Sequence, residues 1–173
     1  SGKPSAGRIT YMGQLIAERL TGQPTDFYCS PAMQHGTDTE PQARAAYSFI
    51  NDVDVVERGL VEHKTIPMFG ASCDGFVGED GLVEFKCPNV ATHIDYLMSQ
   101  KIPKKYFDQM QAQMSCTGRK WCDFMSFDPR MPEHLNKLII RVERDDKYIQ
   151  EMEMEVIKFN LEIDEKLKIL EAL

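Results

Sequence analysis

Apolar residues recur every three or four positions in several parts of the chain, a pattern that predicts amphipathic helices. The first runs from Ile9 to Leu20, and Gly22 suits a C-terminal cap. A polar loop with two prolines is expected from Thr25 to Gly36. A second helix then begins at Asp38 or Thr39, which can cap its first turn.

The second predicted helix has Pro41 in its first turn and an apolar side made of Ala43, Ala46, Tyr47 and Ile50. Helical patterns also cover Thr92 to Gln100 and Lys104 to Cys116. A long terminal helix begins at Asp145, and its apolar stripe packs on the body of the protein or on a neighbouring subunit. The stripe comprises Ile149, Met152, Val156, Phe159, Ile163, Leu167 and Leu170.

Short β-rich segments separate these helices. Apolar and polar residues alternate from Trp121 to Phe127, as in a sheet strand, and Leu138 to Val142 predicts another. Between them, the two prolines of residues 128–132 predict a stiff turn. Four earlier strand segments are Val53–Val56, Leu60–Ile66, Phe69–Ser72 and Leu82–Phe85. The order of elements predicts an α/β fold with a central mixed sheet flanked by helices.

Composition narrows the class of protein. A chain of 173 residues, with 42% hydrophobic and 27% charged residues, suits a single domain, here 1–173. No apolar run reaches the length of a membrane helix. Five cysteines without paired spacing favour reduced thiols over a zinc site or a disulfide framework. A net charge of −7 disfavours a passive polyanion binder but not a nucleic-acid enzyme.

Two carboxylates and a lysine give the strongest chemical signal. Asp74 precedes Gly75-Phe76, and Glu84-Phe85-Lys86 follows ten residues after Asp74. Strand alternation puts Glu84 and Lys86 on one face and Phe85 on the other. Two carboxylates beside a positioned ammonium could hold Mg²⁺, which takes oxygen ligands. Taken alone, two acids and a lysine near a glycine turn more often form a solvated hairpin.

Further patterns lie in order along the chain. Residues 36–44 fit G-x3-E-x2-A-R, residues 72–75 read S-C-D-G, and residues 81–88 fit G-L-x-E-x-K-C-P. Gln109-Met110-Gln111 fits Q-x-Q, and residues 121–131 and 143–148 follow. From about Met12 to the C-terminus, these segments resemble the motifs of the phage lambda exonuclease family, also called YqaJ-like viral recombinases, in which a proline stands in place of Cys73. The family belongs to the PD-(D/E)xK nucleases, so the resemblance implies a restriction-endonuclease-like core.

The resemblance implies a role for each matching residue. Asp74, Glu84 and the carbonyl of Phe85 resemble the magnesium ligands, and Mn²⁺ could substitute for Mg²⁺. Glu40 resembles the helix-borne acid that completes the site, and Lys86 the residue that orients or activates the attacking water. Gln109 resembles the family's polar residue that supports these side chains. The family's arginine for the DNA 5′-phosphate belongs to an N-terminal segment that is expected to be missing here.

The implied activity is that of a magnesium-dependent 5′→3′ exonuclease acting on double-stranded DNA. It would release 5′-mononucleotides and leave a 3′ overhang for homologous recombination. The resemblance also implies a homotrimer, a phage single-strand annealing protein as partner, and the cytoplasm of a bacterial host. The alternatives are an endonuclease or single-strand exonuclease of the same superfamily, or a non-catalytic DNA-binding or scaffold module.

Other residues carry weaker expectations. Contacts with DNA are predicted for Gln111, Lys104, Lys105, Arg119 and Arg130, although surface charges are more often only solvated. The alternation around Trp121 favours a core or subunit-interface position over base stacking. Without a matched histidine, Cys87 is interpreted as a buried structural thiol.

Overall fold

The computed structural model describes residues 5–25 and 28–173, which form two compact units. The first unit contains the described residues up to Tyr28 together with Glu153–Leu173. The second unit is Cys29–Met152 and contains every predicted site residue. The prediction of one nuclease domain over 1–173 stays a prediction. Within the described residues, no helix is both long and apolar enough to cross a membrane.

The first unit pairs helix α1 (Ala6–Thr21) with the later part of helix α5 (Asp146–Glu171). The guanidinium of Arg8 donates to both carboxylate oxygens of Glu162, at 2.8 and 2.7 Å. The rings of Tyr11 and Phe159 stack with their centroids 6.0 Å apart. Gly22 ends α1 with φ of 67°, which confirms the predicted cap and suits glycine.

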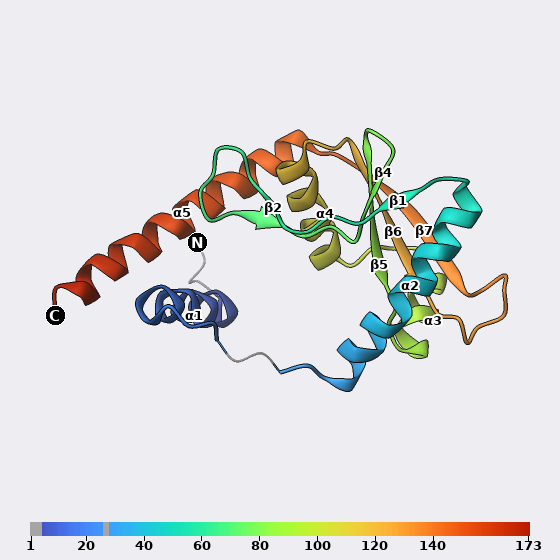
Figure 1. Cartoon of the computed structure of the whole chain (residues 1–173), viewed down its shortest axis with the longest axis horizontal. Coiled ribbons are helices and arrows are strands. Elements are labelled where there is room, and N and C mark those ends of the chain that lie inside the picture. Colours follow the sequence, from blue (N-terminus) through green and yellow to red (C-terminus); the bar gives the residue numbers. More distant parts are fainter. Residues whose placement is uncertain (1–4, 26–27) are drawn as a thin grey trace. The chain divides into compact units, whose positions relative to one another are not determined.

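The second unit is built on a five-stranded mixed sheet in the order β1-β4-β5-β6-β7 (Figure 1). The strand bounds are Val55–Val56, Gly75–Val77, Gly81–Lys86, Trp121–Phe127 and Lys137–Glu143, in that order. Only the β5–β6 pair is parallel in this sheet. A parallel pair needs a crossover connection, and α3 (Val90–Ser99) and α4 (Lys104–Thr117) supply it. Strands β2 (Val61–Glu62) and β3 (Gly70–Ala71) form a separate antiparallel pair.

Each face of the five-stranded sheet carries its own apolar core. On one face, Leu82 and Phe124 pack with Met110 and Met114 of α4. On the other face, Val83, Phe85, Met125 and Phe127 pack with helix α2 (Pro31–Asn51) through Ala43 and Tyr47. The alternation predicted for residues 121–127 is therefore confirmed. It also assigns Glu84 and Lys86, which alternate with Phe85, to the α4 face.

Helix α2 begins earlier than the sequence pattern predicted. Ser30 is its cap, because its Oγ accepts a hydrogen bond from Met33 N at 3.2 Å, and Pro31 occupies the first turn. The loop predicted up to Gly36 and the cap at Asp38 or Thr39 were therefore wrong. Pro41 lies inside the helix rather than in its first turn.

Two further expectations about helix α2 are corrected by its position. Glu40 projects from the middle of the helix rather than from its beginning. Ile50 is 44% exposed and so does not continue the buried side of Ala43 and Tyr47. The buried contacts of α2 therefore end about one turn before the helix does.

Candidate functional site

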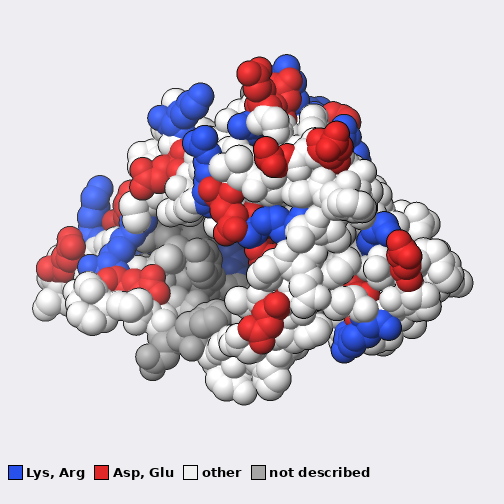
Figure 2. All heavy atoms as spheres, turned by 45° about the vertical axis from the view of Figure 1, so that its right-hand side comes forward, with Lys and Arg blue, Asp and Glu red and all other residues white. Residues whose placement is uncertain are grey.

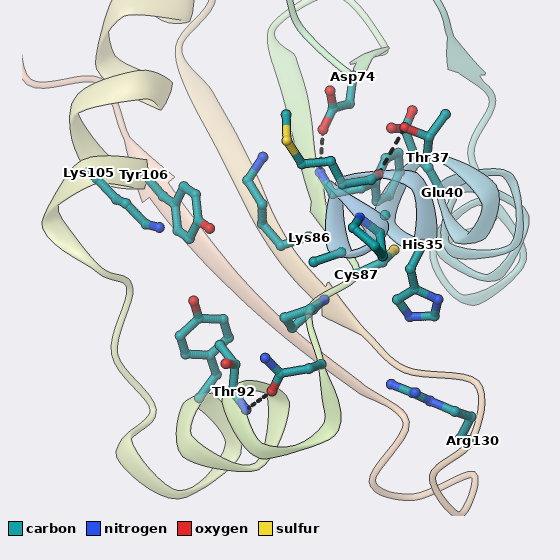
Figure 3. A pocket seen from close by; sticks show the side chains of 18 residues that line it. His35, Thr37, Glu40, Asp74, Lys86, Cys87, Thr92, Lys105, Tyr106 and Arg130 are labelled. Atoms are coloured by element: carbon teal, nitrogen blue, oxygen red, sulfur yellow. Dashed lines mark hydrogen bonds between the residues drawn. The ribbon is translucent and has the colours of Figure 1, made fainter. Parts of the chain in front are cut away.

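A cleft of about 1000 Å³ lies in the second unit, beside the end of β5. Helix α2 supplies Glu40 and His35, the segment before β4 supplies Asp74, and β5 supplies Lys86. Figure 3 shows Glu40, Asp74 and Lys86 around one part of the cleft, with Lys105 and Tyr106 from α4 on one side and Arg130 farther away. Three predicted site residues from separate segments thus share one cavity.

The carboxylate of Glu84 is fully buried, yet it is well supplied with donors. Its Oε1 accepts from the ammonium of Lys86 and from Gln109 Nε2, the latter at 2.8 Å. Its Oε2 accepts from Gln113 Nε2 at 2.5 Å. A buried charge is tolerated when it is paired and hydrogen-bonded, so these side chains allow an acid inside the sheet.

Asp74 lies immediately before β4 and next to β5. Its Oδ2 accepts from the backbone N–H of Phe85 at 2.7 Å, which ties the acid to the strand of Glu84 and Lys86. Its backbone carbonyl accepts from Arg44 Nη2 at 3.1 Å. Strand pairing and side-chain bonds together therefore hold Asp74 beside the Glu84–Lys86 segment.

Glu40 is held by an arginine one turn along α2. Arg44 Nη2 donates to Glu40 Oε1 at 2.6 Å, and Arg44 Nη1 pairs with Glu57. Because the same guanidinium contacts the carbonyl of Asp74, Arg44 connects the acid of helix α2 with the acid that precedes β4. Arg44 lies in the motif of residues 36–44, but no role was predicted for it.

The three acids perturb one another. Burial raises the pKa of Glu84, and the nearby charge of Asp74 raises it further. Burial and the charge of Asp74 likewise raise the pKa of Glu40. Burial also raises the pKa of Asp74, although Lys86, the Phe85 N–H and Arg44 counteract it. Among the described residues, the charges of Lys86 and Arg44 partly balance the negative charge of this site.

Lys86 remains a cation in this arrangement. Burial opposes its charge, but the carboxylates of Glu84 and Asp74 outweigh burial and raise the pKa of Lys86. Its Nζ lies 5.0 Å from the ring centroid of Tyr106, within cation–π range. Tyr106 and the carboxylate of Glu84 therefore hold the Lys86 ammonium at the cleft.

The donor set fits a hard divalent cation. Carboxylate and carbonyl oxygens are the ligands that Mg²⁺ prefers, and repulsion among Glu40, Asp74 and Glu84 would be relieved by a cation. Burial raises the pKa of the Cys87 thiol to about 12, which favours the neutral thiol in the metal-free protein. In the described part of the chain, no three histidine, cysteine or acidic side chains form a preassembled metal cluster.

The residues with weaker predictions fall into two groups. Lys105 and Arg130 line the cleft. Lys104 instead bonds Asp108 and Tyr148, and Arg119 donates to the carbonyl of Gly78 at 2.6 Å. Gln111 is fully buried, and its amide bonds Glu143 O and Asp145 N at 2.9 and 3.0 Å. A direct contact between Gln111 and DNA finds no support in that position.

Sequence reasoning missed Gln113 entirely. It is fully buried on α4, four residues after Gln109, and donates to Glu84. The signal was available, since residues four apart lie on the same side of a helix. The Q-x-Q motif drew attention to Gln111 instead, which faces elsewhere.

The structure also places Cys73, Cys87 and Trp121 in or against the apolar cores. Cys73, which replaces the motif's proline, is buried in the core with Met110 and Met114. Cys87 is buried, as predicted. Trp121 packs against the α2-side core, and Arg141 stacks 3.6 Å from the centre of its ring.

Charge on the surface is mixed in sign. On the face in Figure 2, Lys and Arg side chains are interspersed with Asp and Glu, rather than gathered into one broad basic field. The net charge of −7 agrees with this distribution. Any binding of a polyanion would therefore depend on local groups such as those of the cleft.

Solved structures resemble this chain closely. The alkaline exonuclease LHK-Exo from Laribacter hongkongensis superposes with a TM-score of 0.93 and 46% identity, covering 99% of this chain and 87% of that one. A structure of LHK-Exo in complex with dAMP gives a TM-score of 0.94 over 98% and 86% of the two chains, again at 46% identity. A phage-related exonuclease from Haemophilus somnus 129PT shares the fold, with a TM-score of 0.70 and 15% identity. That superposition covers 97% of this chain and 84% of the Haemophilus somnus chain.

Sequence comparison gives the family. An uncharacterized protein, R354, of Acanthamoeba polyphaga mimivirus is 29% identical over 117 residues, 60% of this chain. The match spans only 21% of that longer viral protein. The sequence profile of the YqaJ-like viral recombinase domain matches residues 2–120. With the 46% identity to LHK-Exo, this match shows that the chain belongs to the YqaJ-like viral recombinase domain family.

Proposed function

We propose that this protein is a magnesium-dependent 5′→3′ exonuclease that degrades one strand of double-stranded DNA from an end. The products are 5′-mononucleotides and a 3′ single-stranded overhang for homologous recombination. The observation that carries the proposal is that Asp74, Lys86 and Glu40 line one cleft, while the buried carboxylate of Glu84 pairs with Lys86. Family membership supports it, as does the 46% identity to a protein described as an alkaline exonuclease.

The acids of the cleft would hold the cation. Asp74, Glu84 and the carbonyl of Phe85 are the proposed ligands, and Glu40 completes the site from α2. A bound magnesium ion acidifies a water and neutralises the charge that develops on the phosphate. Manganese, which also suits oxygen ligands, is expected to substitute.

The other side chains orient the reactants. Lys86 is a half-buried, charged donor that lines the cleft, so its ammonium can orient a water or a phosphate oxygen through a charge-assisted bond. Gln109 holds one oxygen of the Glu84 carboxylate. Donors that are already in position need little rearrangement during the reaction. This preorganisation supplies much of the rate enhancement at such sites.

The DNA strand would follow the basic and polar lining of the cleft. Lys105 and Arg130 line it away from the acids and are the proposed contacts to the sugar–phosphate backbone. Lys104 and Arg119 lie outside the cleft lining and bond other groups of the protein. Arg130 also pairs with Asp128, so a contact between its guanidinium and DNA would share or exchange that partner. Phosphate contacts of this kind position the strand without reading its sequence.

The wider setting is also part of the proposal. The family resemblance supports a homotrimer, DNA ends as substrate and a phage single-strand annealing protein as partner, in the cytoplasm of a bacterial host. Equilibrium sedimentation with and without a DNA end would test the trimer. A monomer under both conditions would overturn that part alone.

End-labelled DNA tests the activity. Linear duplex labelled at its 5′ end should release labelled mononucleotide early in the presence of Mg²⁺, whereas 3′-labelled duplex should release it late. Covalently closed circles should stay intact. Cutting of closed circles would favour the endonuclease alternative, and preference for single strands would favour the single-strand exonuclease.

Substitutions test the site. Glu84→Ala and Asp74→Ala should each slow digestion by at least about 10²-fold, the loss typical of removing one group that stabilises a transition state. DNA binding measured without metal should persist. A parent protein that digests nothing with Mg²⁺ or Mn²⁺ would instead support the scaffold alternative.

A further inference from the structure

Gln113 makes contacts that link the two acid-bearing segments of the site. Its Nε2 donates to Glu84 Oε2 at 2.5 Å and to the backbone carbonyl of Ser72 at 2.9 Å. Its Oε1 accepts a weak bond from the thiol of Cys122. These partners define the orientation of the amide, because its NH₂ faces two acceptors and its oxygen faces a donor.

The two oxygens of Glu84 are held by different side chains. Gln109 and Lys86 both bond Oε1. In the part of the chain that the structure describes, Gln113 is the donor to Oε2. The last torsion of a glutamate side chain is broad, so bonds to one oxygen leave the carboxylate plane poorly defined. The bond from Gln113, one helical turn after Gln109, to Oε2 defines that plane.

The bond to Ser72 extends this effect to the other acid. Ser72 lies two residues before Asp74 on the segment that leads into β4. One buried amide thus holds the side chain of Glu84 and the backbone that places Asp74. The distance between the two carboxylates consequently depends on Gln113, a residue that does not line the cleft itself.

We propose that Gln113 is a positioning residue that sets the orientation of Glu84 relative to Asp74 for a divalent cation. The inference rests on the proposed function, because it assumes that these two carboxylates are ligands. Replacing a residue that hydrogen-bonds a metal ligand typically weakens metal affinity by about 10- to 100-fold. Gln113 acts through Glu84 and Ser72, and touches neither the DNA nor the reacting atoms.

Gln111 offers a matched control on the same helix. Like Gln113 it is fully buried and bonds two groups, but these are the backbone atoms Glu143 O and Asp145 N. Methionine resembles glutamine in length and lack of branching while offering no N–H donor. Gln113→Met and Gln111→Met therefore remove equivalent buried amides, and only the first removes a bond to an acid of the site.

Calorimetric titration of the full chain with Ca²⁺, in the absence of DNA, gives the decisive measurement. The dissociation constant should rise about 10- to 100-fold in Gln113→Met and stay at the parent value in Gln111→Met. Both variants should melt at lower temperature than the parent. Added Ca²⁺ should raise the melting temperature of the parent and of Gln111→Met more than that of Gln113→Met.

A second variant guards against misfolding. Gln113→Asn keeps a polar amide in the core but is one methylene shorter, so it cannot span the same distance to Glu84, and it should also weaken Ca²⁺ binding. If either folded Gln113 variant binds Ca²⁺ as the parent does, the positioning role is overturned while the proposed function stands. A parent that neither binds Ca²⁺ nor digests DNA would overturn both.

Discussion

The hydroxyl of Tyr47 donates a 2.7 Å hydrogen bond to the carboxylate of Asp123, inside the core between helix α2 and strand β6. Arg141 bonds the same carboxylate through Nε and Nη2, at 2.8 and 2.9 Å. Helix α2 also carries Glu40 and Arg44. This bond is therefore the polar anchor of the helix that brings the third acid to the cleft.

Tyr47→Phe should lower the free energy of unfolding by about 1.5–3 kcal/mol, the usual contribution of a hydrogen bond to a charged group. Trp121 is the chain's single tryptophan and lies in β6, so its fluorescence reports urea unfolding of this unit. Tyr28→Phe is the control, since Tyr28 is 80% exposed. Equal midpoints for Tyr47→Phe and the parent would contradict this role.

Lys86→Met should separate catalysis from cation binding. Turnover should fall by about 10²- to 10³-fold, because an oriented positive donor is lost from the site. Calcium binding should be at least as tight as in the parent, because the ammonium no longer competes for Glu84 Oε1. Single-turnover digestion measures the loss of turnover, and calorimetry measures Ca²⁺ affinity. A loss of Ca²⁺ affinity as large as the loss of turnover would contradict the prediction.

Removing metal should stop digestion without unfolding the protein. The carboxylate of Glu84 keeps Lys86, Gln109 and Gln113 as partners when no cation is bound. Circular dichroism in EDTA should therefore show the helical signal of the magnesium-containing sample. Magnesium at 100 times its dissociation constant should add about 2.7 kcal/mol to stability by mass action. A collapse of the helical signal in EDTA would contradict this account.

Asp128 should contribute to stability in a pH-dependent way. Hydrogen bonds from the Arg130 guanidinium and backbone hold the pKa of this buried carboxyl below its usual value, although burial opposes them. A lowered folded-state pKa gives stabilisation above the ordinary pKa of about 3.9, and this is lost as pH falls through the folded value.

Asp128→Asn measures that contribution. The parent should exceed the variant in unfolding free energy by a constant amount between pH 5 and 7, and the gap should narrow below about pH 4. Asp95→Asn, an exposed residue of α3, serves as the control. A gap that widens in acid would show that the ion pair has the opposite effect.

The sequence was most informative where local pattern and tertiary packing agree. Alternation from Trp121 to Phe127 predicted β6 with its observed bounds, because each face meets a different apolar core. Glu84 and Lys86 were correctly predicted to share a face, since that follows from strand geometry alone. Helix α4 was also recovered closely from its spacing.

The sequence was least informative where two local signals compete. Both Ser30-Pro31 and the segment before Pro41 suit a helix start, and the structure uses the earlier one. Packing of the later turns on the sheet outweighs the backbone bond that Pro41 cannot make. Gln113 was missed for another reason, because its partners lie on β5 and before β4, far away along the chain.

The pairing of β5 has a consequence for how this protein can vary. The strand is bonded to β4 on one side and to β6 on the other, in a defined register. Inserting or deleting one residue there would turn Phe85 toward the α4 face and send Glu84 and Lys86 into the apolar layer beneath α2. Length changes in this strand are therefore expected to disappear from a mutant library, whereas many single replacements around it survive.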